Sequence, residues 1–199
     1  MTTEFDVFIS GEAVDLVVLT EQLAAQSNWY AWFNDASVTN MMQHHYFPNT
    51  PALQVQFFKE NIEGNRSTLQ MGVVHKMDRV FIGVISLSAI NFQHRKCEIG
   101  GLIGETRYQS LVYYVEAFRL MLDHGFEQLN MRRIYGGTLI KELADLLIRV
   151  FGFSLEGVKR QDVFKNGAYM DVYLLGLIKD EYKPVSRKTN NQEKGTDLV

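Results

Sequence analysis

The chain has 199 residues, 46% of them hydrophobic and 22% charged, and a formal net charge of −3. This length suits one domain with a sizeable core, and the acidic balance argues against nucleic-acid binding, which needs a basic face. The single cysteine, Cys97, excludes an internal disulfide and points to a reducing compartment. Because the chain lacks a signal-peptide pattern and any apolar run of about 18–20 residues, we expect a cytoplasmic protein without membrane contact.

The first half of the chain alternates short strands with two helices. We predict strands at 5–10 and 14–19, helices at 21–33 and from 51 to about 64, and strands at 68–75 and 80–90. Thr50 and Pro51 indicate the start of the second helix, since a hydroxyl cap followed by proline favours a first turn. The connection at 38–49 is expected to be irregular.

The second half is organised around residues 97–126, which read as a strand, a short loop and a long helix. Apolar residues recur every three or four positions in this helix: Leu111, Val115, Phe118, Leu122, Phe126 and Leu129. A strand at 133–139 and a helix at 142–151 follow, and Gly152 is placed to end that helix in the left-handed conformation. Asn166-Gly167 predicts a hairpin between strands 154–164 and 168–178.

This order predicts a mixed sheet with helices on both faces and one βαβ crossover. The polar residues from about 180 to 199 show no periodicity, and we expect them to be poorly ordered or weakly docked.

Several short motifs occur in a characteristic order between residues 5 and 180. They are W-F-N-D at 32–35, F-I-G-V-I-S-L at 81–87, E-I-G at 98–100, L-D-H-G-F-E-Q-L-N-M-R-R-I at 122–134 and F-G-F-S-L-E-G at 151–157, followed by the hairpin at 162–176. In this order the chain resembles the GNAT superfamily of acyl-CoA-dependent N-acyltransferases. The similar branch acetylates nucleotide-linked amino sugars and the N-termini of ribosomal proteins.

The resemblance implies an α/β (α+β) GNAT fold. Its central mixed sheet would have about seven strands, flanked by helices on both faces, with a splayed central strand pair. We expect one acyltransferase domain at 1–180 and a flexible tail at 181–199.

The resemblance also implies acetyl-CoA, or another acyl-CoA, as co-substrate and no metal. The pyrophosphate loop of the family, Q/R-x-x-G-x-G/A, aligns with Gln109, Ser110, Leu111, Val112, Tyr113 and Tyr114. Val112 and Tyr114 replace the usual small residues, although backbone N–H groups at a helix start still attract an anion. Lys141 aligns with a cofactor-side asparagine, and Ile148 with a tyrosine that protonates the thiolate in many members. The strand residues Gly101, Leu102 and Ile103 correspond to those that expose backbone donors.

Three residues are candidates for proton transfer. Glu98 precedes Gln109 by 11 residues, as the catalytic carboxylate does in some members, and is our candidate general base; alternatively it forms an ion pair with Arg95 or Lys96. His45 and Tyr46 lie in the connection that lines the acceptor side in related proteins, where histidine accepts a proton near neutral pH. Alternatively, this connection packs over the sheet as an aromatic loop.

Three functions remain open. The first is N-acyl transfer to a small-molecule amine, a nucleotide-linked amino sugar. The second is acetylation of protein or peptide N-termini, as in the ribosomal-protein branch, and the third is binding of CoA or a partner without catalysis. A homodimer through the last strands is also expected from the resemblance.

Overall fold

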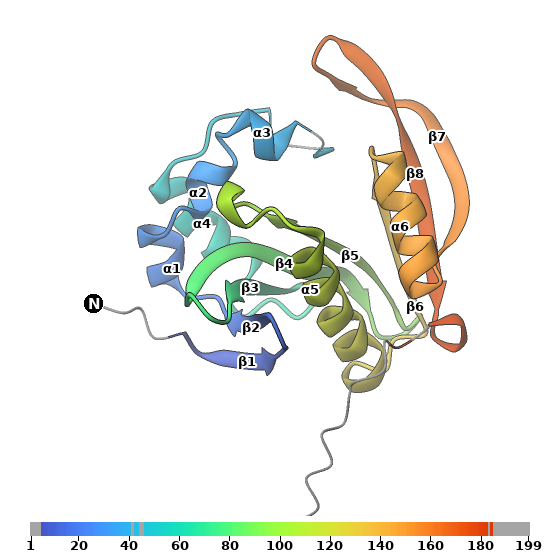
Figure 1. The fold of residues 1–199 in the computed structure, drawn as a ribbon, viewed down its shortest axis with the longest axis horizontal. Helices are drawn as coiled ribbons and strands as arrows, with labels where there is room; N and C mark the ends of the chain where they lie inside the picture. The colour runs from blue at the N-terminus through green and yellow to red at the C-terminus, as the bar shows by residue number, and fades with distance from the viewer. Residues whose placement is uncertain (1–4, 41, 44–45, 183, 185–199) are drawn as a thin grey trace, which may run out of the picture.

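The computed structural model describes residues 5–40, 42–43, 46–182 and 184. In this part of the chain, eight strands form one sheet in the order β1-β2-β3-β4-β5-β6-β8-β7 (Figure 1). The strands are β1 (Val7–Ser10), β2 (Val14–Val18), β3 (Leu69–His75), β4 (Val80–Asn91), β5 (Lys96–Ile103), β6 (Arg133–Thr138), β7 (Ser154–Lys165) and β8 (Ala168–Ile178). Neighbours are antiparallel except β5 and β6. The predicted mixed sheet is confirmed: it contains the eight strands expected from the sequence, including the short β1, whereas the family resemblance implied about seven.

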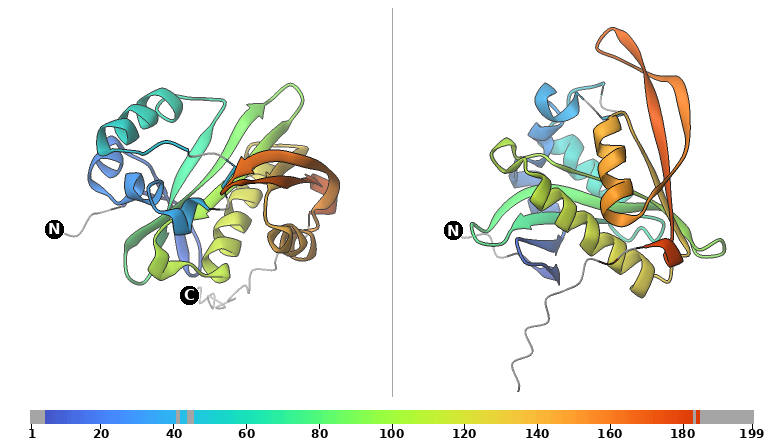
Figure 2. Two further views of the ribbon diagram at one scale, coloured as in Figure 1. Left: turned by 90° about the horizontal axis from the view of Figure 1, so that it is seen from above. Right: turned by 45° about the vertical axis from the view of Figure 1, so that its right-hand side comes forward.

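Helices cover both faces of the sheet, as predicted (Figure 2). One face carries α1, α2 and α4 around Trp29 and Trp32, and the other carries α5 and α6 around Phe118 and Phe151. The helices are α1 (Glu21–Gln26), α2 (Trp29–Trp32), α3 (Ala36–Thr39), α4 (Pro51–Asn61), α5 (Leu111–Asp123) and α6 (Lys141–Phe151). Within the described residues, no helix combines the length and the apolarity needed to span a bilayer.

The helix predicted at 21–33 is interrupted, so this prediction was wrong in detail. Ser27 adopts an extended conformation after α1, and its hydroxyl donates to the carbonyl of Leu23 at 2.5 Å and accepts from the N–H of Trp29 at 3.2 Å. A serine that bonds to the backbone on both sides ends one helix and starts the next. The connection expected to be irregular also contains α3, which Asp35 caps through the N–H of Ser37.

The hairpin turn and the helix end that were predicted in the second half of the chain are confirmed. Asn166 and Gly167 both have positive φ, 53° and 79°, as a two-residue type I′ hairpin requires, and Gly152 caps α6 at φ 88°. The long helix reaches Leu129 as predicted, but its last turn, His124–Gln128, widens to a π-helix.

Strands β5 and β6 pair only over a short stretch. Their parallel ladder joins Lys96, Cys97 and Glu98 to Arg133–Tyr135, and it does not extend to Gly100 or Gly136. Each strand continues beyond the ladder along a different neighbour, β4 or β8. The predicted splayed pair is therefore present.

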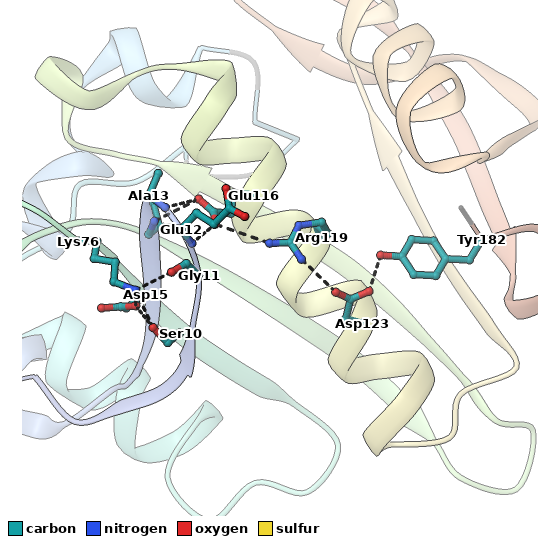
Figure 3. Close-up of polar contacts among 11 residues, drawn as sticks. Ser10, Gly11, Glu12, Ala13, Asp15, Lys76, Glu116, Arg119, Asp123 and Tyr182 are labelled. Atoms are coloured by element: carbon teal, nitrogen blue, oxygen red, sulfur yellow. Dashed lines mark hydrogen bonds and ion pairs between the residues drawn. The ribbon is translucent and has the colours of Figure 1, made fainter. Parts of the chain in front are cut away.

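Helix α5 is also bound to the rest of the fold through a line of charged side chains (Figure 3). Arg119 lies 3.6 Å from the carboxylate of Glu116 and 3.3 Å from that of Asp123. The hydroxyl of Tyr182 donates to Asp123 at 2.7 Å, and its ring packs on Phe126. Tyr182 thus lies against the helix although it belongs to the segment expected to be a loose tail.

Candidate active site

Three cavities follow one another around the splayed strands. The first, here called the helix cavity, lies between the start of α5 and the helix α6 and has a volume of about 720 Å³. Its lining includes Ile103, Gln109, Ser110, Leu111, Tyr114 and Arg149. The start of a helix offers unpaired N–H groups and the positive end of its dipole, so this cavity can receive an anion.

The second, the wedge cavity of about 270 Å³, occupies the gap between β5 and β6. It is lined by Ile99–Leu102 on one strand and Gly136–Thr138 on the other. A Cβ at Gly136 would lie 2.9 Å from the carbonyl oxygen of Ile99, so any larger residue at this position would press against β5. The unpaired edge of β5 leaves backbone groups free to bind an amide-rich chain or a developing oxyanion.

The third, the loop cavity of about 440 Å³, lies on the side of the sheet covered by α4. The aromatic residues Phe33, Phe47 and Phe57 form part of its wall, and Asn49, Gln54, Gln70 and Ser86 supply its polar side chains. A small molecule of moderate size fits such a volume.

The three cavities share their walls. Tyr114 lines both the helix cavity and the wedge cavity, and Gly100, Gly101 and Leu102 line both the wedge cavity and the loop cavity. A molecule that reaches from the start of α5 into the gap between the strands would therefore end beside anything bound in the loop cavity.

The predicted pyrophosphate loop, residues 109–114, departs from the family pattern but does not close the helix cavity. Leu111 and Val112 are each 63% exposed, and Val112 is not part of the cavity lining. Ser110 caps α5 by accepting from the N–H of Val112 at 3.3 Å. Tyr113 does not line the helix cavity, and the centroid of its ring lies 5.0 Å from that of His75.

Tyr114 is half-buried and lies where the helix cavity meets the wedge cavity. Its ring stacks on Phe118 with centroids 5.1 Å apart, and burial raises the pKa of its phenol. A phenol with a raised pKa stays protonated at neutral pH, so its O–H is available as a donor in the cavity.

None of the predicted proton-transfer residues in the described part lines these three cavities, although Tyr46 lines a fourth cavity of about 620 Å³ together with Gln43. Glu98 is exposed and faces Tyr135 across the ladder, where its charge adds to burial in raising the pKa of Tyr135. Tyr46 is 59% exposed, and its hydroxyl lies 3.0 Å from the carbonyl of Gln43. His45 lies outside the described residues. Lys141 forms an ion pair with Asp145 at 2.7 Å.

The polar residues of the loop cavity were not among the sequence candidates. Asn34 and Asn49 exchange two hydrogen bonds, at 2.6 and 2.8 Å, which fix the backbone at the entry to α4. Asn49 in turn donates to Gln54 at 2.8 Å. The W-F-N-D motif contained Asn34, but no local pattern linked it to a residue 15 positions later.

The sheet order, the splayed strands and the joined cavities agree with the arrangement expected of an acyl-CoA-dependent N-acyltransferase. The model of the acetyltransferase (GNAT) domain family matches residues 17–146, more than half of the chain. The chain belongs to this family.

Two kinds of relative illustrate the range of the family. Spermidine N(1)-acetyltransferase of Escherichia coli K12 is 32% identical over 104 residues, which cover 50% of this chain and 54% of that enzyme. The structure of the Vibrio cholerae spermidine N-acetyltransferase with CoA and spermine has a TM-score of 0.76 at 20% identity, covering 86% of this chain and 98% of that one. The ribosomal-protein-S5-alanine acetyltransferase of Vibrio fischeri has a TM-score of 0.74 at 24% identity, covering 90% and 100%. At these identities the two structures show the shared fold.

Proposed function

We propose that this protein transfers an acetyl group from acetyl-CoA to a primary amine by direct attack of the amine on the thioester. The observation that supports this most strongly is the shared wall of the wedge and loop cavities at Gly100–Leu102. Donor and acceptor bound on the two sides would meet there, and such positioning supplies much of the rate enhancement in a two-substrate reaction.

The helix cavity would hold the diphosphate of the donor. Its contacts in this proposal are the N–H groups of the first turn of α5, with Gln109, Ser110 and the guanidinium of Arg149 at the wall. The pantetheine arm would follow the open edge of β5 along Gly101, Leu102 and Ile103. Lys141 remains a predicted contact from the resemblance alone.

In the chemical step, the amine nitrogen bonds to the carbonyl carbon, the carbon–sulfur bond breaks and the thiolate leaves with a proton. Backbone N–H groups of β5 would stabilise the oxyanion, and Tyr114, at the junction of the two cavities, would give the proton to sulfur. Glu98, His45 and Tyr46 remain predicted proton carriers on the acceptor side. For Glu98, unchanged turnover of Glu98→Gln between pH 6 and 9 would remove it as the base.

The acceptor is a small amine or a peptide N-terminus. The nucleotide-linked amino sugar predicted from the sequence remains one candidate, since Phe47 in the loop cavity offers a stacking surface. Neither kind of relative described above is named for such a substrate. The predicted homodimer also remains open, and the edge strand β7 exposes Leu155 and Val158.

The test follows free thiol while the purified protein is incubated with acetyl-CoA and an amine panel of polyamines, amino-acid amides, peptides and amino-sugar nucleotides. Thiol release that depends on an amine supports the proposal. If there is no release with any amine and calorimetry shows no binding of acetyl-CoA, the proposal is wrong.

A further inference from the structure

We propose that Gln54 selects the acceptor by donating a hydrogen bond to its carbonyl oxygen, so that the preferred substrate is a compact amine next to an amide, as in an amino-acid amide or a peptide N-terminus. This inference rests on the proposed acyl transfer and names the acceptor class. It starts from one buried amide group in the wall of the loop cavity.

Gln54 is 1% exposed, lines the loop cavity and leaves its Nε2 without a hydrogen-bond partner among the described residues. The orientation of its amide is fixed by a chain of bonds. The N–H of Thr50 donates to Oδ1 of Asn49 at 2.9 Å, so Nδ2 of Asn49 is the donor to Oε1 of Gln54 at 2.8 Å. Nε2 of Gln54 is therefore the free end, and it can only donate.

A buried donor without a partner costs roughly 1–3 kcal/mol, and this cost disappears when a ligand oxygen accepts from it. Of the other polar side chains in the described lining, Asn49 is bonded as above and the Ser86 hydroxyl lies 3.3 Å from the carbonyl of Gly100, so the half-buried Gln70 adds the one further amide. The rest of the wall is largely aromatic or aliphatic, with Phe47 and Phe57 among it. An acceptor with one carbonyl oxygen and an otherwise apolar body matches this cavity better than a sugar with many hydroxyl groups.

Charge and protonation support the same acceptor. None of the described residues that line the loop cavity is charged, so they offer a polyamine no carboxylate. An α-amino group, with a pKa of about 8, is roughly one-quarter neutral at pH 7.5, whereas an amine like that of lysine is neutral in about one molecule per thousand. A described lining without a carboxylate base suits the amine that is already partly neutral.

The decisive comparison uses L-phenylalaninamide and 2-phenylethylamine, which share the ring and the amine but differ in the carboxamide. The variant Gln54→Glu keeps the length and the oxygen that accepts from Asn49, and it replaces the free donor with a carboxylate oxygen, which also adds a negative charge. Gln56→Glu makes the same change at an exposed position of α4 and is the matched control.

We expect the wild type and Gln56→Glu to acetylate phenylalaninamide better than spermidine or an amino-sugar nucleotide. In Gln54→Glu, kcat/KM should fall about tenfold for phenylalaninamide and less than twofold for phenylethylamine, while the Kd for acetyl-CoA stays unchanged. Equal losses for both amines, or a preference for spermidine in the wild type, would overturn the inference. Gln54→Met, which adds no charge, repeats the comparison if the glutamate variant fails to fold.

Calorimetry of phenylalaninamide with CoA present separates this inference from the proposed function. Binding that weakens about tenfold in Gln54→Glu but not in Gln56→Glu supports the role of Gln54 even if no amine is acetylated. Equal binding to all three proteins would contradict it, whatever the turnover.

Discussion

The carboxylate of Glu116 on α5 accepts a hydrogen bond from the backbone N–H of Ala13 at 2.8 Å, although 103 residues separate them. The N–H of Val14 donates to the same oxygen at 3.2 Å. One nearly buried side chain therefore closes the turn between β1 and β2 and attaches it to the helix whose first turn forms the helix cavity (Figure 3).

Removing this carboxylate should destabilise the fold. Glu116→Ala leaves buried N–H groups without an acceptor, and we expect the free energy of unfolding to fall by about 2–4 kcal/mol, as measured by urea denaturation. Glu60→Ala, an exposed position on α4, is the control and should change it by less than about 0.5 kcal/mol. Equal stability of the two variants would show that the Glu116 contacts contribute little.

Tyr114→Phe should slow the acetyl-transfer step more than it weakens the binding of acetyl-CoA. If Tyr114 protonates the thiolate, kcat should fall about 100-fold while the KM for acetyl-CoA changes little. Because burial raises the pKa of this phenol, it stays protonated, and the wild type should show no alkaline loss of kcat from Tyr114 up to pH 10. Tyr113→Phe is the control, since Tyr113 packs on His75, and equal rates in both variants would remove Tyr114 from the mechanism.

Two neighbouring glycines should respond differently to alanine. A Cβ at Gly100 meets nothing within 4 Å, whereas one at Gly101 would lie 2.8 Å from the carbonyl oxygen of Val84. Gly100→Ala should keep the wild-type Tm and still lower kcat/KM for the amine at least tenfold, because the methyl group enters the junction of the cavities. Gly101→Ala should instead lower the Tm. Full activity of Gly100→Ala would place the reaction elsewhere.

Arg149→Ala should raise the KM for acetyl-CoA about tenfold if its guanidinium pairs with a phosphate. The effect should vanish with S-acetylpantetheine, which has no nucleotide, and should shrink at high salt. Lys141→Ala offers a comparison, because Lys141 is already paired with Asp145. A similar loss with both donors would mean that Arg149 acts on the fold and not on the phosphates.

Cys97 should be inert in the folded protein. It is fully buried, and burial raises the pKa of its thiol to about 12, so almost no thiolate exists at pH 8. Iodoacetamide should label it only after unfolding, as mass spectrometry would show. A raised thiol pKa also means that this group lowers stability as the pH rises from about 8.5 toward 12. Rapid labelling in native buffer would contradict the buried position.

The sequence predicted the elements that local chemistry controls. Thr50-Pro51, Asn166-Gly167 and Gly152 each determine a backbone conformation within a few residues, and the structure confirms all three. The break at Ser27 was missed because the apolar period continues across it, while the hydroxyl bonds to the backbone instead.

The candidate site was only partly accessible to the same reasoning. Family alignment pointed to Gln109 and Ser110 because the loop is contiguous in the chain, and both line the helix cavity. Gln54 and Gln70 line one cavity from a helix and a strand, and neither occupies a motif position. The significance of Gln54 depends on its burial and on a missing hydrogen-bond partner, which exist only after the chain has folded.

The short ladder between β5 and β6 has a mechanical consequence. Three paired positions join the two strands, and the backbone beyond Glu98 and Tyr135 has no rung between them. A ligand whose amides hydrogen-bond to both strands in that gap would connect β5 to β6. Amide hydrogens of Gly100–Ile103 and Gly136–Thr138 should then exchange more slowly with CoA bound, so that occupancy of the donor site stiffens the middle of the sheet.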